Sequence, residues 1–501
     1  MASLIFALIF VLFLLLCQVL LGSGGSARVF VKPQKGDRDD ISDAVLRGYQ
    51  QFTQPSGKPF FVRYWRQDYM VLPVKYLADV RRADKNHLAF SETIRDVLFI
   101  YSWIGTLFES NRLVAAVIKG VNPQLSVLSH PLIQESSFAF EKELGLAIGE
   151  SKTFNTIELM TNILLRTMTR VIGGRELSRN EKFLEGIKAY FNGIFLTGST
   201  MLKMPSNPWI RNFLAWPLYT YHQRFRQQPL IDMIKPIAAR RLQGDRSGID
   251  EKHDFDIIQC SLDRLDEFPF DKNSRTSPIQ TLSQEILHMV WASGQSPALI
   301  MASVLYKLLE EPSYIEPLRD EVRLAVKNHG WTDGIYRDLP KMDSFIREIN
   351  RVHPGFSLAV SRIVQDRPFV FSDGFTIPPG VRIAFPAEAS QHDPEIIGGP
   401  AKFDGFRFAR LAEKDARQED GANRWAATHT SNSNFAFGYG NHACPGRFIS
   451  VRALKTILAR ILLDYDFFWD RTGGAPPRQW MEGISVPDVK QEITFRRRKT
   501  D

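Results

Sequence analysis

The stretch that decides the fold and the chemistry runs from residue 437 to residue 448. It reads Phe437-Gly438-Tyr439-Gly440-Asn441-His442-Ala443-Cys444-Pro445-Gly446-Arg447-Phe448. One cysteine thus lies in an aromatic, glycine-rich loop directly before a helical pattern. The backbone N–H groups of such a loop, and the N-terminal end of a helix predicted to begin near Pro445, favour a thiolate over a thiol. We therefore expect Cys444 to hold a metal ion through its sulfur.

Three other residues of this loop are expected to serve the bound group. Gly440 and Gly446 would let the backbone pass close to a flat cofactor, where any side chain would clash. Phe437 would cover the sulfur and exclude water, which tunes the redox behaviour of a metal. The other interpretation is a structural cysteine in a glycine-rich loop, and it does not account for the spacing of the whole pattern.

The spacing Phe-x-x-Gly-x-His-x-Cys-x-Gly resembles the haem-binding signature of the cytochrome P450 family, and it is complete here. The resemblance implies a mainly α fold with small β-sheets and a haem b (heme) cofactor with Cys444 as the axial thiolate ligand of the iron. His442 and Arg362 match family positions that contact haem propionates, with ordinary surface charge as the alternative. The family's Trp-x-x-x-Arg haem contact has no match, so one propionate partner is unassigned.

A second motif supports the same family. Glu348 and Arg351 lie at positions i and i+3 of a predicted helix, where they share one face. A Glu-x-x-Arg pair alone is common on solvated helices, but here Phe403–Phe408 and then the cysteine loop follow it. In the resembled family this pair and a later arginine, matched by Arg407, form a buried triad that braces the cysteine loop.

The expected oxygen site departs from the family pattern. The apolar helical stretch Thr281–Tyr306 matches the helix that crosses the haem in the family. Its Ala/Gly-Gly-x-Asp/Glu-Thr motif reads here Ala292-Ser293-Gly294-Gln295-Ser296-Pro297. Gln295 cannot donate a proton as an acid does, whereas the Ser296 hydroxyl can relay one through water. Pro297 removes the hydrogen bond to the Ser293 carbonyl, so we expect a local kink. The alternative is a helix irregularity without catalytic meaning.

The overall composition is that of a globular protein, with 501 residues, 44% hydrophobic and 24% charged. Only three cysteines occur, so there is no disulfide framework and a reducing compartment is expected. The net charge of +8 shows no clustered pattern typical of nucleic-acid binding. It does suit docking of an acidic electron donor or an anionic membrane.

The N-terminus predicts a membrane anchor. Ser3–Leu21 carries no charge over 19 residues, and as a helix it would reach roughly 28 Å, close to the ~30 Å hydrocarbon thickness. Basic residues from Arg28 onward place the body in the cytoplasm by the positive-inside rule. A cleaved signal peptide, with cleavage in Gly22–Ala27, is the alternative. We predict an anchor at 1–21, a linker at 22–45 and one catalytic domain at 46–501.

The remaining pattern predicts helices from Lys75 to about residue 327, with a break at Pro131, and strands and turns after residue 353. Phe60–Trp65 and the segment 69–73 are predicted to form a β-hairpin. A pair of strands is predicted within residues 484–496.

The resemblance covers about residues 46–501 and is closest to fungal secondary-metabolism enzymes, such as those acting on ent-kaurene-type and indole diterpenes. It implies a monooxygenase of the endoplasmic reticulum membrane that uses O₂ and NADPH through a separate NADPH–cytochrome P450 reductase. The implied substrate is a hydrophobic natural product, a terpenoid or meroterpenoid. The pocket walls expected from family position are Trp291, Gly294, Gln295, Pro354–Leu358 and Trp480–Ile484. Two alternatives are a haem-thiolate isomerase or dehydratase that needs no reductase, and a non-enzymatic haem sensor.

Overall fold

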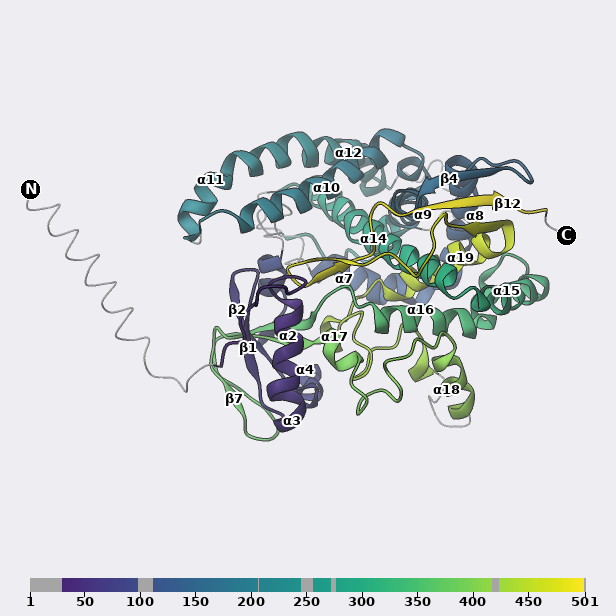
Figure 1. The fold of residues 1–501 in the computed structure, drawn as a ribbon. Helices are drawn as coiled ribbons and strands as arrows, with labels where there is room; N and C mark the ends of the chain where they lie inside the picture. The colour runs from purple at the N-terminus through teal and green to yellow at the C-terminus, as the bar shows by residue number, and fades with distance from the viewer. Residues whose placement is uncertain are drawn as a thin grey trace, which may run out of the picture.

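The computed structural model describes residues 29–97, 111–205, 207–244, 256–271, 276–416 and 423–499. Figure 1 shows a mainly helical body with small sheets at its margins. Three long helices form its centre: α9 (Thr156–Ser178), α14 (Pro278–Glu310) and α19 (Arg447–Asp464). Other helices pack around them, namely α8 (Leu125–Glu143), α10 (Glu181–Leu202), α12 (Gln228–Leu242), α15 (Ile315–His329) and α16 (Pro340–Val352).

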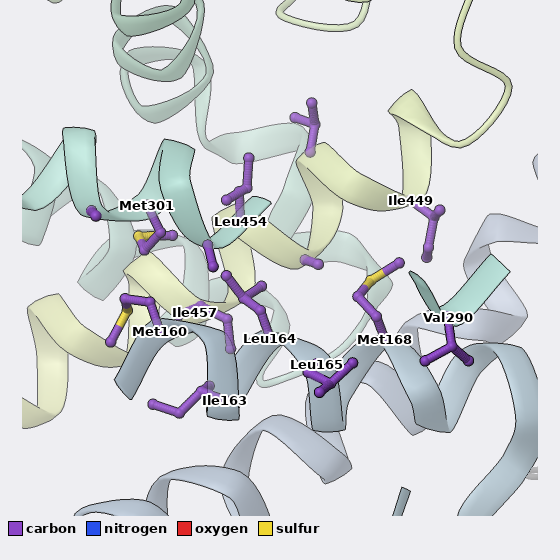
Figure 2. Close-up of a cluster of buried hydrophobic side chains, with 14 of the residues drawn as sticks. Met160, Ile163, Leu164, Leu165, Met168, Val290, Met301, Ile449, Leu454 and Ile457 are labelled. Atoms are coloured by element: carbon purple, nitrogen blue, oxygen red, sulfur yellow. The ribbon is translucent and has the colours of Figure 1, made fainter. Parts of the chain in front are cut away.

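The three central helices meet in the core shown in Figure 2. α9 contributes Met160, Ile163, Leu164, Leu165 and Met168; α14 contributes Val290 and Met301; α19 contributes Ile449, Leu454 and Ile457. All of these side chains are almost completely buried. Because Ile449 lies in the first turn of α19, packing in this core fixes the point where the cysteine loop ends.

The largest sheet has five strands in the order β1 (Phe60–Tyr64), β2 (Gln67–Val71), β8 (Arg382–Pro386), β5 (Leu358–Val364) and β3 (Leu88–Ala89). β1 and β2 pair antiparallel with Phe60 opposite Val71, which confirms the predicted hairpin. A bulge in β5 lies between Ala359 and Arg362, where Val360 has a φ of +55°. Such a bulge shifts the register and re-aims the residues that follow it, here Arg362.

Two predictions about local structure were wrong. Pro131 lies inside α8 and does not break it, because packing of α8 against α9 and α19 offsets one lost backbone hydrogen bond. The strands at the C-terminal end do not pair with each other: β11 (Ile484–Val486) pairs with β10 (Gln479–Met481), while β12 (Glu492–Arg497) lies between β4 (Ser151–Asn155) and β9 (Tyr465–Phe468). Partners so distant in the chain leave no signal in local spacing.

The described part of the predicted linker is folded onto the domain. The amide of Val31 donates to the carbonyl of Phe61 over 2.9 Å, and α2 (Ser42–Gly48) begins beside the buried side chain of Ile41. The folded body therefore begins well before residue 46. None of the helices in the described ranges is long and apolar enough to cross a bilayer, and the predicted anchor, residues 1–21, lies outside those ranges.

Candidate active site

Cys444 lies in a loop closed by its own backbone. The amide of Cys444 donates to the carbonyl of Phe437 over 2.8 Å, and a single 3-10 turn spans Gly440–His442 between them. Gly438 and Gly440 have φ values of +73° and +70°, a backbone region that favours glycine. Directly after the loop α19 begins at Arg447, as the sequence predicted near Pro445.

The sulfur of Cys444 is not packed against other side chains of the protein. Its side chain is accessible, yet the surrounding protein is dense enough that desolvation raises the pKa of the thiol. Hydrogen bonds from the N–H groups of Gly446 and Arg447 lower this pKa in part, as expected for a group at a helix N-terminus. Since a bound metal cation deprotonates a coordinating thiol outright, this environment fits a metal ligand.

The loop glycines Gly440 and Gly446 have different surroundings. A Cβ on Gly440 would lie 3.0 Å from the Cα of Arg81, so that glycine is required by its positive φ and by a neighbouring helix, α4 (Leu77–Arg82). A Cβ on Gly446 would meet nothing within 4 Å. Only Gly446 therefore borders open space of the kind that a flat cofactor requires. Phe437 is partly buried against the hydrophobic core.

Two basic residues without a carboxylate partner in the described ranges, Arg362 and His442, lie respectively beside the loop and in it. Arg362 is 2% exposed and donates only to carbonyls, 2.6 Å to Ser361 and 3.2 Å to Tyr439. No carboxylate in the described ranges pairs with it, and burial lowers its pKa to about 10. His442 has a buried Nε2 without a hydrogen-bond partner. Burial, together with the charge of Arg362, lowers the pKa of His442 to about 4.

The ring of Phe90 contacts both of these groups. Its centroid lies 5.5 Å from that of His442 and 5.3 Å from the guanidinium carbon of Arg362. A buried cation and an unsatisfied imidazole nitrogen are costly unless an anion completes them. The residues present therefore fit a carboxylate-bearing cofactor, and haem propionates have that chemistry.

The structure brings Glu348, Arg351 and Arg407 together. The Glu348 carboxylate accepts two hydrogen bonds from Arg351, both of 2.8 Å, and one of 3.3 Å from Arg407. Arg407 also donates to the carbonyls of Gly399 and Lys402, each over 3.0 Å. This network ties α16 to the segment that leads into α18 (Arg407–Asp415). All three charges are satisfied, as a buried ionic cluster requires.

Gln295 and Ser296 lie in the middle of α14. Most of this helix is buried, but Ala292 and Ser296, one turn apart, are exposed within the helical body. Their side chains are therefore accessible, and Figure 2 shows that α14 and α19, which carry Val290 and Ile449, meet in one core. Helical backbone continues through Pro297 without a break, so the expected kink is not visible as an interruption of α14. Contacts with α9, α12 and α16 hold the helix on several sides.

Two of the residues expected to line the pocket, Gly294 and Trp480, contact other parts of the protein. Gly294 is buried, and a Cβ there would lie 2.8 Å from Leu165 and 3.1 Å from Phe191, so it serves packing between helices. The ring of Trp480 is covered by the guanidinium of Arg38 at 4.2 Å. In contrast, the segments 354–358 and 480–484 are joined, because the amide of Ser357 donates to the carbonyl of Gly483 over 2.8 Å.

Sequence reasoning missed two contacts that hold the cysteine loop. Nη1 of Arg447 donates to the Cys444 carbonyl over 2.8 Å, while its Nε donates to Thr428 over 2.9 Å. The side-chain Nδ2 of Asn122 donates to the carbonyl of Pro445 over 3.2 Å. The Asn-Pro dipeptide at 122–123 marks a turn, but nothing in the sequence indicated what the turn contacts.

These observations first define the class of protein. A helical body with an accessible cysteine sulfur in a glycine-rich loop, beside a buried arginine and an unsatisfied histidine nitrogen, fits a haem-thiolate protein. The chain belongs to the cytochrome P450 family, whose model, described as Cytochrome P450, matches residues 116–495. The family implies a haem-thiolate iron cofactor and monooxygenase activity.

Similar proteins indicate the kind of P450 enzyme to which this chain is related. The chain is 34% identical to the cytochrome P450 monooxygenase sirB of Leptosphaeria maculans, over 94% of this chain and 89% of that one. It is 29% identical to the ent-kaurene oxidase P450-4 of Gibberella fujikuroi, over 91% and 87%, and 30% identical to the cytochrome P450 monooxygenase paxP of Penicillium paxilli, over 91% and 85%. These relatives indicate a fungal secondary-metabolism monooxygenase.

The fold has a counterpart among solved structures. A retinoic acid-bound cyanobacterial CYP120A1 superposes with a TM-score of 0.64 at 18% identity, covering 91% of this chain and 95% of that one. This confirms the mainly helical fold with small sheets.

Proposed function

We propose that this chain is a membrane-anchored P450 monooxygenase that oxidises a hydrophobic natural product, a terpenoid or meroterpenoid. The observation that carries the proposal is the accessible sulfur of Cys444 on a rigid loop, together with the accessible Ser296 on α14. The relatives named as ent-kaurene oxidases support a terpenoid substrate. An apolar substrate also suits an enzyme held at a membrane.

Cys444 would ligate the haem iron, and Arg362 and His442 would hold its propionates. When bound, the haem supplies the oxygen activation, because a thiolate ligand favours cleavage of the O–O bond. Phe437 would limit access of water to the sulfur. Gly446 would admit the cofactor to the backbone, since a Cβ there would project into open space.

Ser296 and Gln295 of α14 would bind water and pass protons through it. Neither side chain hydrogen-bonds to another group in the described part of the chain, whereas Ser293 donates to the carbonyl of Val290 over 3.2 Å. Pro297 also leaves the Ser293 carbonyl without its usual helical donor. A free hydroxyl, a free amide and a free carbonyl within one turn can bind water and relay a proton through it.

Electrons would come from a separate NADPH–cytochrome P450 reductase, and the net charge of +8 suits docking of an acidic partner. We further propose that residues 1–21 anchor the chain in the endoplasmic reticulum membrane with its body in the cytoplasm. The uncharged stretch from Ser3 to Leu21 supports this anchor.

The test uses membranes that contain the full chain and a reductase, supplied with ent-kaurene and related diterpenes under isotopically labelled O₂. The proposal predicts NADPH-dependent oxygen uptake and a product that carries one labelled oxygen atom, seen by mass spectrometry. Turnover of the substrate without any electron donor would instead favour the isomerase or dehydratase, whose motivation is the missing acid at Gln295.

A further inference from the structure

Two nitrogen donors without a partner lie one turn apart on helix α14. Nε1 of Trp291 is closed to solvent and has no hydrogen-bond partner within the ranges that the structure describes. An indole N–H can only donate. His288, three residues earlier, is 2% exposed. Because residues three apart lie on one side of a helix, the two rings leave α14 in the same general direction.

The second donor is Nδ1 of His288. Burial lowers the pKa of this histidine to about 3, so its ring is neutral and carries one proton. Its Nε2 lies 3.2 Å from Nε2 of Gln227, an amide nitrogen that can only donate. The ring proton therefore lies on Nδ1. No acceptor for this N–H occurs in the described part of the chain, whereas Nδ1 of His392 lies 2.8 Å from the carbonyl of Glu388.

Helix α10 and the π-helical turn η7 (His222–Gln227) pack against this side of α14, and Figure 1 shows α10 and α12 lying over α14. The ring of Phe191 on α10 lies 6.2 Å from that of Trp291. Tyr190, next to it, is fully buried, and its hydroxyl has no hydrogen bond of ordinary geometry to any described residue. Gln227 is nevertheless close enough to oppose the effect of burial, which raises the pKa of Tyr190. Turns of the π type are frequent at functional sites.

These donors share a helix face with the expected oxygen site. His288, Trp291 and Gln295 lie at i, i+3 and i+7 of α14, which places them on one side of the helix. At a rise of 1.5 Å per residue, His288 lies about 12 Å along the helix axis from Ser296. A molecule that contacts both ends of this face would have about the length of a fused-ring terpenoid.

The chemistry of the donors selects a neutral oxygen acceptor. The N–H groups of His288 and Trp291 donate, and the hydroxyl of Tyr190 can donate as well. None of these groups carries a charge, so a carboxylate would be buried beside them without a cation. A hydroxyl or carbonyl oxygen can accept from them, whereas a pure hydrocarbon would leave them unpaired. Buried donors that are left unpaired discriminate against the analogue that lacks the oxygen.

We propose that His288 and Trp291 bind a hydroxyl or carbonyl oxygen of the substrate and so select molecules that already carry an oxygen group. This inference rests on the proposed oxidation of a terpenoid and specifies its substrate class. Gln227 is a positioning residue, because it keeps the ring proton of His288 on Nδ1. The reaction that supplies the substrate must therefore introduce or expose a hydroxyl or carbonyl group.

The experiment measures binding of ent-kaurene and of its monohydroxylated isomers, each added alone, to the full-length holoprotein. The shift of the Soret band on binding gives each dissociation constant. Trp291→Phe removes one N–H and keeps an aromatic ring, and His288→Phe removes the other N–H. The control on the same helix is Ser283→Ala, whose buried hydroxyl already donates to the carbonyl of Ile279 over 2.7 Å. The thiolate-type band of the carbon monoxide complex shows which variants are folded, and Trp291→Phe decides the test if His288→Phe loses that band.

The wild type and the control should bind at least one of the alcohols about ten-fold more tightly than ent-kaurene. Each variant should lose most of this preference and keep its affinity for ent-kaurene within about two-fold, since the hydrocarbon makes no hydrogen bond. Equal affinities for the alcohols and the hydrocarbon in the wild type, or a preference that the folded variants retain, would overturn the inference and leave the proposed function standing. A Soret band that shifts with none of these compounds would contradict the terpenoid proposal as well.

Discussion

Nε of Arg351 lies 2.8 Å from Oε2 of Glu348, and water reaches neither side chain. The same carboxylate accepts the backbone N–H of Asp404 over 3.1 Å. One buried charge thus connects helix α16 to the chain segment that precedes the cysteine loop.

Replacing Glu348 with alanine should destabilise the protein severely, because the buried guanidinium of Arg351 and the partly covered one of Arg407 lose their anion. Breaking a buried pair in this way costs about 3–5 kcal/mol. The free energy of unfolding in urea and the haem content of the purified protein measure the effect. Asp320→Asn is the control, since its pair with Arg323 is exposed and such pairs contribute about 0–1 kcal/mol. Normal haem content and stability in Glu348→Ala would contradict the bracing role.

Arg362→Leu and His442→Leu should each weaken haem retention, because each removes a group for which the protein itself provides no anion. We expect faster haem transfer to an excess of apomyoglobin, and the double variant should be fastest. Arg367→Leu, an exposed cation three residues after strand β5, serves as the control. Haem transfer at the wild-type rate in both single variants would contradict the proposed propionate contacts.

Ser296→Ala should leave haem binding intact but lower the fraction of electrons that reach product, since the free hydroxyl that relays protons is lost. Gln295→Ala should act in the same direction. The ratio of hydrogen peroxide released to NADPH consumed measures this coupling. Ser293→Ala, whose hydroxyl is already engaged with the helix backbone, is the control on the same turn. If the Ser296 and control variants couple equally well, Ser296 has no catalytic role.

Acid should destabilise the protein through buried histidines. Burial lowers the pKa of His288 and His353 to about 3 and that of His222 to about 4, from 6.5. Because these pKa values are depressed, the stability is fully present above pH 6.5 and is lost as the pH falls towards 4. Each histidine contributes a slope of about 1.4 kcal/mol per pH unit in that window.

His288→Gln should make the free energy of unfolding depend less steeply on pH, by the contribution of one proton. The glutamine amide does not titrate, and it still offers Gln227 a hydrogen-bond partner. Urea unfolding between pH 4.5 and 7.5 measures the two slopes, because this range includes the pKa of an unperturbed histidine, roughly 6.5. Identical slopes in the two proteins would show that His288 does not take up its proton on unfolding.

The parts of this protein that sequence could predict are those with a local pattern. The cysteine loop, the Glu348–Arg351 pair and the first hairpin each occupy a few consecutive turns or strands, so spacing alone specifies their geometry. Gly440 was singled out because a side chain there would clash with a cofactor. The close contact in the structure is with the backbone of Arg81, which is distant in the chain and left no signal in the loop sequence. Pro131 and the partners of β12 were missed because tertiary packing decides them. The exposed apolar side of helix α11 (Pro208–Tyr221), with Trp209 and Phe213, was missed because an apolar helix of 14 residues reads equally well as core.

The central claim is that the sulfur at position 444 binds the haem iron, and Cys444→Ser tests it most directly. The reduced protein with carbon monoxide should show the thiolate-type Soret band in the wild type, and the variant should lose that band even when haem is supplied in excess. A variant that retains the thiolate-type band would contradict the account.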